Sequence, residues 1–329
     1  MKICIIGSAG HTNYVLDGVR RDKDSRIVGI AAGIQGEGID KLTEQIGELG
    51  EKPAVFDDYR EMLEQLQPDV VAVASHFYQQ ASITLEVLKR GINVFVEKPV
   101  ATNLSELASV KRFYQQSNLH LAAMFGIRYK PWFMTAWKLV QQGGVGKVRL
   151  MNAQKSYKLG SRPEFYKKRE TYGGTIPWVG SHAVDWLHWF SGERFETVYA
   201  AHSSQYNQGH GELEVSALLH FRLTNGVMGS VNIDYLRPDT AGSHGDDRIR
   251  VAGTEGVIEV CDERVFLINS KKKGVQEVSL ENSEGIFLDF LRQVRGKGKC
   301  LVSAEDSFYI TEVCLKARVA ADENRIVML

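Results

Sequence analysis

The chain has 329 residues, and because single cores seldom grow beyond about 250–300 residues, two domains are expected. Lysine plus arginine equals aspartate plus glutamate, 40 of each, so no net field favours nucleic acid or an anionic membrane as a partner. The four cysteines form neither a CxxC pair nor a zinc spacing, and no signal-peptide core or long apolar run is found, so we expect a cytoplasmic protein without a metal site.

The first expected elements are a strand at residues 2–6 and a helix from Tyr14 to Arg21, joined by a glycine turn. This order is the context of the dinucleotide fingerprint GxGxxG, although Ala9 and Thr12 replace its second and third glycines. Backbone amides at the helix start can still hold a pyrophosphate. The expected cofactor-binding residues of the turn are Gly7, Ser8, Ala9, Gly10, His11 and Thr12.

The second expected strand, residues 26–31, lacks the acid that usually holds the ribose hydroxyls of NAD. It ends in Ala31-Ala32-Gly33, and Ala32 is expected to lie beside the cofactor. No arginine is nearby to receive a 2′-phosphate, and the following loop offers only Gln35 and Glu37. The choice between NAD and NADP therefore stays open, with NAD slightly favoured.

The alternation continues up to residue 123, where we place the end of a dinucleotide-binding domain. Ser75 and His76 follow the fourth strand, and topology places them near the cofactor crevice. Strands that alternate with helices predict a parallel, doubly wound sheet. The remaining strands are expected at residues 54–56, 70–74, 91–97 and 119–124, and the helices at 58–66, 77–90 and 103–116.

The motif Glu97-Lys98-Pro99 ends the fifth strand. Pro99 has no backbone donor and forces Lys98 towards an extended conformation, so the strand stops there. An amine is then held just beyond a strand end, where ligands bind in open α/β sheets. Lys98 is therefore the first catalytic candidate, and a solvated lysine is the alternative.

The second part of the chain, residues 124–329, is predicted to be an α+β domain. Successive strands without helices indicate a large, mostly antiparallel open sheet. A sheet with one uncovered face needs a partner, so a homodimer or homotetramer through this sheet is expected. Helices are expected at residues 132–142 and 304–321, strands at 148–157, 197–203, 214–223, 226–235, 247–252, 257–261, 265–269 and 276–279, and a hairpin tip at 271–274.

A second chemical stretch runs from Gly173 to Trp189. His182, Asp185 and Trp186 fall at helical spacing i, i+3 and i+4, so they share one face. His182 is either a site residue in the first turn of the helix or a core histidine among aromatic residues. Asp185 either fixes the imidazole tautomer or forms a cap or salt bridge.

These motifs in combination resemble the Gfo/Idh/MocA oxidoreductases, typified by glucose–fructose oxidoreductase and inositol dehydrogenase, over the whole chain. The resemblance implies a Rossmann domain, a substrate-binding and oligomerisation domain, and hydride exchange between a nicotinamide and a sugar, cyclitol or polyol carbon. The family has an aspartate four residues before the histidine, where this chain has Trp178. The motifs are Glu97 to Ala101, Arg128 to Pro131, Gly173-Gly174, Gly180 to His182, Asp185, Val251 to Gly256 and Val302 to Asp306.

The family resemblance makes Lys98 and His182 the expected acid–base pair, with Asp185 beside them. Glu97 and Lys98 are also expected near the cofactor. The expected substrate-binding residues are Lys98, Arg128, Tyr157, Trp178 and His182, whereas Lys155 and Arg169 are expected more often to be solvated surface residues. Two alternatives stay open: a redox-assisted glycoside hydrolase that uses bound NAD, and a catalytically silent nucleotide- or sugar-binding protein.

Overall fold

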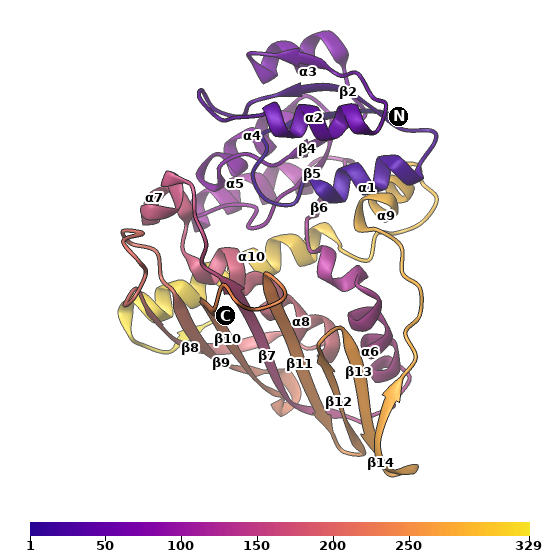
Figure 1. Ribbon diagram of the computed structural model, residues 1–329, viewed down its shortest axis with the longest axis vertical. Coiled ribbons are helices and arrows are strands. Elements are labelled where there is room, and N and C mark those ends of the chain that lie inside the picture. Colours follow the sequence, from indigo (N-terminus) through magenta and orange to yellow (C-terminus); the bar gives the residue numbers. More distant parts are fainter. The chain divides into compact units, whose positions relative to one another are not determined.

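The computed structural model describes all of residues 1–329 (Figure 1). The chain divides into two compact units. The first comprises Met1–Gly126, Glu170–Gly173 and Glu284–Thr311, and the second comprises Ile127–Arg169, Gly174–Ser283 and Glu312–Leu329. The first unit is therefore built from both ends of the sequence.

The first unit is organised around a six-stranded parallel sheet in the order β3-β2-β1-β4-β5-β6. All four residues of β4 are buried, as expected for a strand that is covered on both faces. This topology confirms the predicted doubly wound sheet. The strands are β1 (Lys2–Ile6), β2 (Arg26–Ala31), β3 (Ala54–Phe56), β4 (Val70–Val73), β5 (Asn93–Val96) and β6 (Leu121–Ala123).

The helices of the first unit include three that the sequence analysis did not predict: α2 (Asp40–Glu48), the short α7 (Arg169–Tyr172) and α9 (Ile286–Val294). Helix α9 packs against α1, where a Cβ atom at Gly18 would lie only 2.7 Å from the Phe287 ring (Figure 1). The remaining helices are α1 (Asn13–Arg21), α3 (Tyr59–Leu66), α4 (Phe77–Lys89) and α5 (Leu104–Gln115), whereas α7 begins at the last residue of a second-unit segment.

The second unit is built on a nine-stranded sheet in the order β14-β13-β12-β11-β7-β10-β9-β8-β15. Every pairing is antiparallel except that of β7 with β10, which confirms the mostly antiparallel sheet. The strands are β7 (Val148–Lys158), β8 (Phe195–Ser203), β9 (Ser216–Leu223), β10 (Met228–Arg237), β11 (Gly245–Gly253), β12 (Gly256–Cys261), β13 (Arg264–Asn269), β14 (Lys272–Val278) and β15 (Val327–Met328).

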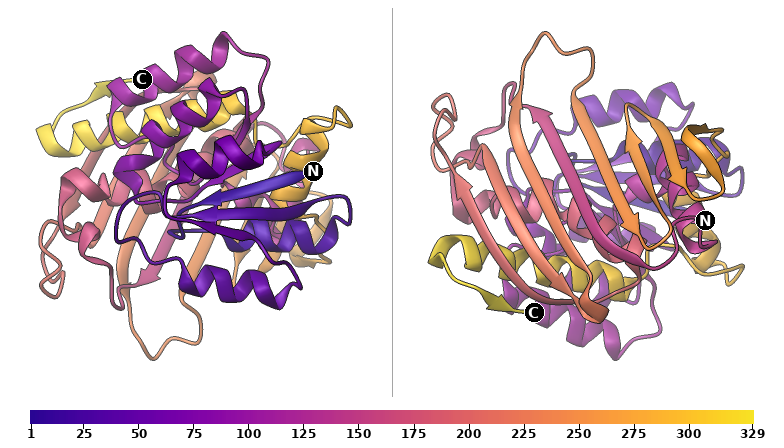
Figure 2. Two further views of the ribbon diagram at one scale, coloured as in Figure 1. Left: turned by 90° about the horizontal axis from the view of Figure 1, so that it is seen from above. Right: turned by 90° about the horizontal axis from the view of Figure 1, so that it is seen from below.

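One face of this sheet is covered by α6 (Pro131–Gln141) and α8 (Ser181–Ser191). The opposite face carries no helix, as the right-hand view of Figure 2 shows. The long helix α10 (Ala304–Glu323) begins in the first unit and ends in the second. The prediction of a hairpin tip at residues 271–274 is wrong, because β14 already begins at Lys272, which pairs with Asn269 of β13.

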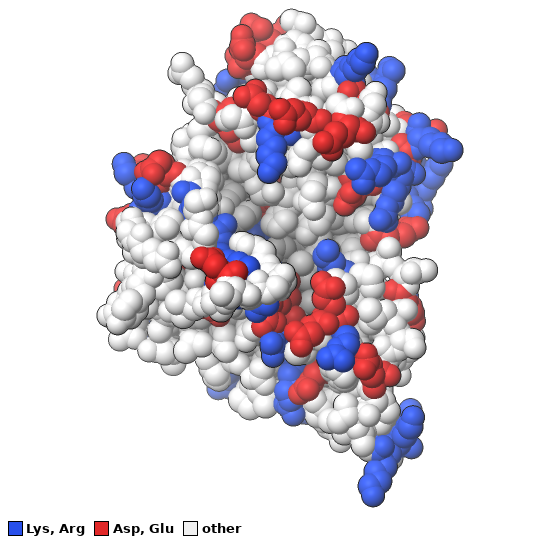
Figure 3. Space-filling model, in the orientation of Figure 1, with Lys and Arg blue, Asp and Glu red and all other residues white.

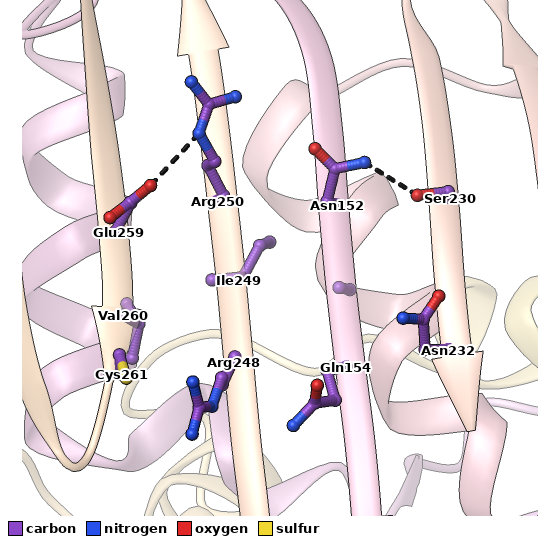
Figure 4. A pocket seen from close by; sticks show the side chains of 11 residues that line it. Asn152, Gln154, Ser230, Asn232, Arg248, Ile249, Arg250, Glu259, Val260 and Cys261 are labelled. Carbon is purple, nitrogen blue, oxygen red and sulfur yellow. Dashed lines mark hydrogen bonds and ion pairs between the residues drawn. The ribbon is translucent and has the colours of Figure 1, made fainter. Parts of the chain in front are cut away.

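The helix-free face of the sheet is mixed in polarity. Leu218 and Leu236 are 62% and 60% exposed. A shallow groove of ≈ 320 Å³ crosses β7, β10, β11 and β12. Two pairs of its polar side chains bond to each other, Asn152 with Ser230 at 2.7 Å and Arg250 with Glu259 at 3.1 Å (Figure 4). The homodimer or homotetramer through this sheet stays a prediction, which light scattering would test.

The charged side chains are interspersed. On the face drawn in Figure 3, acidic and basic groups lie close to one another on a mainly uncharged surface, in keeping with the formal net charge of zero. No helix of the structure combines the length and apolarity that crossing a lipid bilayer requires.

Candidate functional site

The glycine turn lies at the carboxyl ends of the neighbouring strands β1 and β4. The amide of Gly7 donates to the carbonyl of Ala31 at 2.8 Å, and the amide of Ala9 donates to the carbonyl of Ala74 at 2.6 Å. Gly7 has φ +83°, and a Cβ atom there would lie 2.5 Å from the Cα atom of Ser75. Only glycine therefore fits at the start of this turn, which stands where the strand order reverses and ligands bind in such sheets.

The turn fits a dinucleotide in spite of its altered fingerprint. The amides of Gly10, Thr12 and Asn13, at the start of α1, have no hydrogen-bond acceptor in the protein. Such amides, aligned with the helix dipole, are the usual ligands of a pyrophosphate. Gly10 has φ +79°, and a Cβ atom there would overlap the Glu97 carboxylate.

The Glu97 carboxylate connects the end of β5 to the glycine turn. It is fully buried, and it accepts hydrogen bonds from the amide of His11 at 2.5 Å and from the amide of Lys98 at 2.8 Å. The His11 ring lies 2.8 Å from the same carboxylate and stacks on Tyr14. Burial raises the pKa of Glu97, but the neighbouring His11 and Lys98 outweigh burial and hold this pKa below its ordinary value.

Lys98 is the second residue after β5, and it is only 1% exposed. The alternative of a solvated lysine is therefore wrong. Beyond it the Lys98–Pro99 peptide is cis, and the amide of Val100 donates to the hydroxyl of Thr311 at 3.3 Å. The backbone on both sides of Lys98 is thus anchored within the first unit.

The remaining expected cofactor residues surround the same edge of the sheet. Ala32 continues from β2, and Ser75 and His76 follow β4. The Ser75 hydroxyl donates to the Glu37 carboxylate at 2.8 Å. His76 is half-buried, and burial lowers the pKa of its ring, whereas the charge of Glu37 raises it. Glu37, which the sequence placed only in the loop after β2, therefore interacts with both Ser75 and His76 at this edge of the sheet.

In the second unit, a π-helical turn at Ile176–Gly180 leads into α8. Trp178 lies in the turn and is 7% exposed, and His182 lies in the first turn of α8 and is 1% exposed. Gly180 is required for packing, because a Cβ atom there would come within 2.4 Å of Ile233. The sequence prediction of the helix and of the position of His182 in it is confirmed.

Asp185 forms a buried ion pair with Arg128. The guanidinium donates from Nε at 2.9 Å and from Nη2 at 2.5 Å, and the two side chains are 1% and 2% exposed. The guanidinium also lies 5.5 Å from the Trp189 ring centroid. The salt bridge considered for Asp185 is thus present, and it fixes Arg128 to α8.

Lys155 was expected to be solvated, and this expectation is wrong. Its side chain is 2% exposed, and its ammonium lies 2.6 Å from both oxygens of Asp247, 4.7 Å from the Tyr157 ring centroid and 5.7 Å from that of Trp186. Burial lowers the pKa of Lys155, and Asp247 opposes this shift. Strand alternation could have found it, because Lys155 follows the buried residues Met151 and Ala153 at a period of two.

Tyr157 and Arg169 are also held by neighbouring groups. The Tyr157 ring stacks on His244, with 5.0 Å between the centroids. Arg169 pairs with Glu214 and Asp322 and is 29% exposed. Trp186 lies one turn after His182 on α8, so the two side chains share one side of this helix. The Lys155 amine lies against the Trp186 ring, so an imidazole, an amine and an aromatic face are found on that side. Such a set can hydrogen-bond and stack against a polyhydroxylated molecule.

No group of three or more histidine, cysteine, aspartate or glutamate side chains is placed to hold a metal ion.

Two stretches of the chain match the models of the N-terminal and the C-terminal domain of one known protein family. Residues 1–125 match an oxidoreductase family with an NAD-binding Rossmann fold, and residues 133–259 match the GFO/IDH/MocA C-terminal domain. The chain belongs to the Gfo/Idh/MocA oxidoreductases.

Solved structures extend this family assignment to the full length. A Thermotoga maritima protein, named only in general terms as an oxidoreductase, is 52% identical, with a TM-score of 0.98 and complete coverage of both chains. A levoglucosan dehydrogenase in complex with NADH and levoglucosan is 17% identical, with a TM-score of 0.85 over 100% of this chain and 99% of that one. The second likeness shows a shared fold alone.

Curated relatives of the Gfo/Idh/MocA family are more distant. The myo-inositol 2-dehydrogenase of Thermotoga maritima is 25% identical over 309 residues, which are 88% of each chain. This chain spans 65%, 38% and 21% of the length of the first three curated relatives that it matches, which is less than two thirds in each case.

Proposed function

We propose that this chain is an NAD(P)-dependent dehydrogenase that transfers hydride between a nicotinamide cofactor and a hydroxyl-bearing carbon of a sugar, cyclitol or related polyol. One observation carries the proposal: the Glu97 carboxylate ties the glycine turn to the strand end that bears Lys98, whose amine is 1% exposed. The names of two relatives, myo-inositol 2-dehydrogenase and levoglucosan dehydrogenase, support this class of substrate.

The cofactor is held by the first unit. The amides at the start of α1 receive the pyrophosphate, and Ala32, Ser75 and His76 border the nucleotide at the ends of β2 and β4. The bound nicotinamide supplies the acceptor or donor of the hydride. Glu97 positions the turn, because it holds the amide and the ring of His11 together.

Lys98 and His182 act as the acid–base pair. A hydride can leave a carbinol carbon only as the hydroxyl proton is taken up, so a base must hydrogen-bond that oxygen. Lys98 takes this proton in the oxidative direction and returns it in the reductive direction, and His182 shares the same oxygen. Both side chains are shielded from bulk water, which strengthens such hydrogen bonds.

Other residues of the second unit bind the substrate or position α8. Trp178 stacks on the apolar face of the sugar ring, in place of the family aspartate at this position. Tyr157 and Lys155 present a phenol and an amine to substrate hydroxyls. Arg128 and Asp185 fix the first two turns of α8, so they position His182 and are not themselves acids or bases.

The test is a Lys98→Met variant, assayed by reduced-nicotinamide absorbance against a panel of sugars, cyclitols and polyols. We expect kcat to fall at least about 10²-fold, while the dissociation constant of the nucleotide changes little. Lys89→Met, which removes an exposed lysine at the end of α4, is the matched control and should behave as the wild type.

Three results would contradict the proposal in different ways. Retained turnover in Lys98→Met would remove Lys98 from the mechanism. Release of a chromogenic aglycone without net cofactor reduction would favour a redox-assisted glycoside hydrolase instead. Failure of the wild type to bind either nucleotide would leave a catalytically silent protein.

A further inference from the structure

The end of β2, Ala31-Ala32-Gly33, does not carry the acid that usually binds the adenosine ribose. Ala32 and Gly33 follow this strand, and a Cβ atom at Gly33 would lie only 2.5 Å from the Cβ atom of Ser75 and 3.0 Å from Ile83. The backbone after β2 therefore runs too close to the end of β4 for a side chain at position 33. An acceptor for ribose hydroxyls has to come from elsewhere in the chain.

The loop after β2 brings the carboxylate of Glu37 back to the end of this strand. Gly36, with φ +82°, reverses the chain, and the amide of Glu37 donates to the carbonyl of Ile34 at 3.2 Å. The Ser8 hydroxyl donates to the carbonyl of Gly38 at 2.6 Å, which fastens the loop to the glycine turn. The loop is thus closed on itself and attached to β1's carboxyl end.

The Glu37 carboxylate is buried and partly satisfied. One oxygen accepts from the amide of Ser8 at 3.1 Å, and the other accepts from the amide of Gly33 at 3.0 Å and from the Ser75 hydroxyl at 2.8 Å. The residue is 8% exposed. A carboxylate offers about four acceptor positions, so the oxygen that faces Ser8 retains room for one more donor.

We propose that Glu37 supplies the carboxylate that β2 lacks, accepts a hydrogen bond from the adenosine ribose of NAD, and rejects the 2′-phosphate of NADP. The inference rests on the proposed function, because it assumes that a nicotinamide dinucleotide binds at the glycine turn. A buried carboxylate repels a phosphate dianion and has no proton to donate to it. No lysine or arginine lies between Arg26 and Lys41 to neutralise that phosphate.

The experiment measures nucleotide binding without catalysis. The dissociation constants of NADH and NADPH are determined by calorimetry for the wild type, for Glu37→Gln and for Glu48→Gln, an exposed carboxylate-to-amide control on α2. We expect the wild type to bind NADH at least about 10-fold more tightly than NADPH. In Glu37→Gln, NADH binding should weaken about 10-fold and the preference should largely disappear, because a charge-assisted hydrogen bond and a repulsion are both lost. Glu48→Gln should match the wild type.

Circular dichroism without nucleotide checks that Glu37→Gln is folded, and Glu37→Asp replaces it if it is not. The aspartate keeps the charge but withdraws it by one methylene, so NADH binding should weaken and the preference should narrow. Tighter binding of both nucleotides by Glu37→Gln would overturn the inference, since Glu37 would then cover the site instead of binding ribose. An unselective wild type would overturn it while the proposed function stands, and a wild type that binds neither nucleotide would refute both.

Discussion

The ion pair between Arg128 and Asp185 offers the sharpest test of how the second unit is held together. Both side chains are almost fully buried and share two hydrogen bonds, so solvent screens the pair little. In Asp185→Asn, the guanidinium of Arg128 stays buried without its counter-charge. We therefore expect the free energy of unfolding to fall by about 3–5 kcal/mol.

The double variant Arg128→Met/Asp185→Leu removes both charges and fills the space with apolar atoms. Its free energy of unfolding should return to within about 1–2 kcal/mol of the wild type, because desolvation of two ions no longer opposes folding. The single variants Arg128→Met and Asp185→Leu form a cycle with this double variant, and the coupling energy should be several kcal/mol.

Tryptophan fluorescence in a urea titration reports on the second unit selectively. All five tryptophans lie there: Trp132, Trp137, Trp178, Trp186 and Trp189. The control is Arg264→Met, which breaks an exposed pair with Glu277 in the same unit and should change little. Two results would refute the conclusion that this buried ion pair stabilises the packing of α8: a decrease in the free energy of unfolding of less than about 1 kcal/mol in Asp185→Asn, or additive effects of the two substitutions in the cycle.

Three further outcomes are expected. The pKa of Glu97 is below its ordinary value in the folded state, so this carboxylate stabilises the fold above its unfolded pKa, and the contribution is lost as the pH falls through the folded pKa. In Glu97→Gln, the free energy of unfolding measured with urea should therefore fall less steeply at acidic pH than in the wild type. An unchanged pH dependence would contradict this. Gly7→Ala should cost at least about 1–3 kcal/mol and abolish NADH binding in a fluorescence titration, because its Cβ atom would overlap the backbone of Ser75. Asp247→Asn should lower the pKa of Lys155 further, so that the unfolded state binds more protons than the folded state and the free energy of unfolding of the variant rises with pH. Unfolding curves at several pH values would detect this rise. A pH dependence equal to that of the wild type would count against it.

The features that the sequence predicted well depend on local chemistry. The Asn103 side chain accepts a hydrogen bond from the amide of Glu106 at 3.0 Å, and Ser303 caps α10 in the same way through the amide of Asp306 at 2.9 Å. Each cap is visible in four consecutive residues. The parallel sheet was predictable for a similar reason, because turn residues such as Gly7, Gly33 and Pro99 follow its strands within a few positions.

The features that the sequence did not predict depend on partners distant in the chain. Lys155 is buried only because Asp247, on the neighbouring strand β11, supplies its counter-charge. Glu37 reaches the glycine turn because Gly36 reverses the loop and Gly33 leaves no room for a side chain. Helix α9 is an exception, because its signal is local: its buried residues Ile286, Phe287, Phe290 and Leu291 have helical spacing in the sequence.

The composition of the first unit from distant segments has a consequence for biosynthesis. Phe287 fills the space beside Gly18, and Arg295 pairs with Asp22, so the α1 side of this unit is finished by residues near the carboxyl end. Arg295 follows Asp22 by 273 residues, so α1 leaves the ribosome long before the side chains that pack on it have been made. Until then the nascent nucleotide-binding half exposes apolar surface, and we expect it to rely on chaperones during translation and to refold poorly as an isolated fragment ending near residue 126.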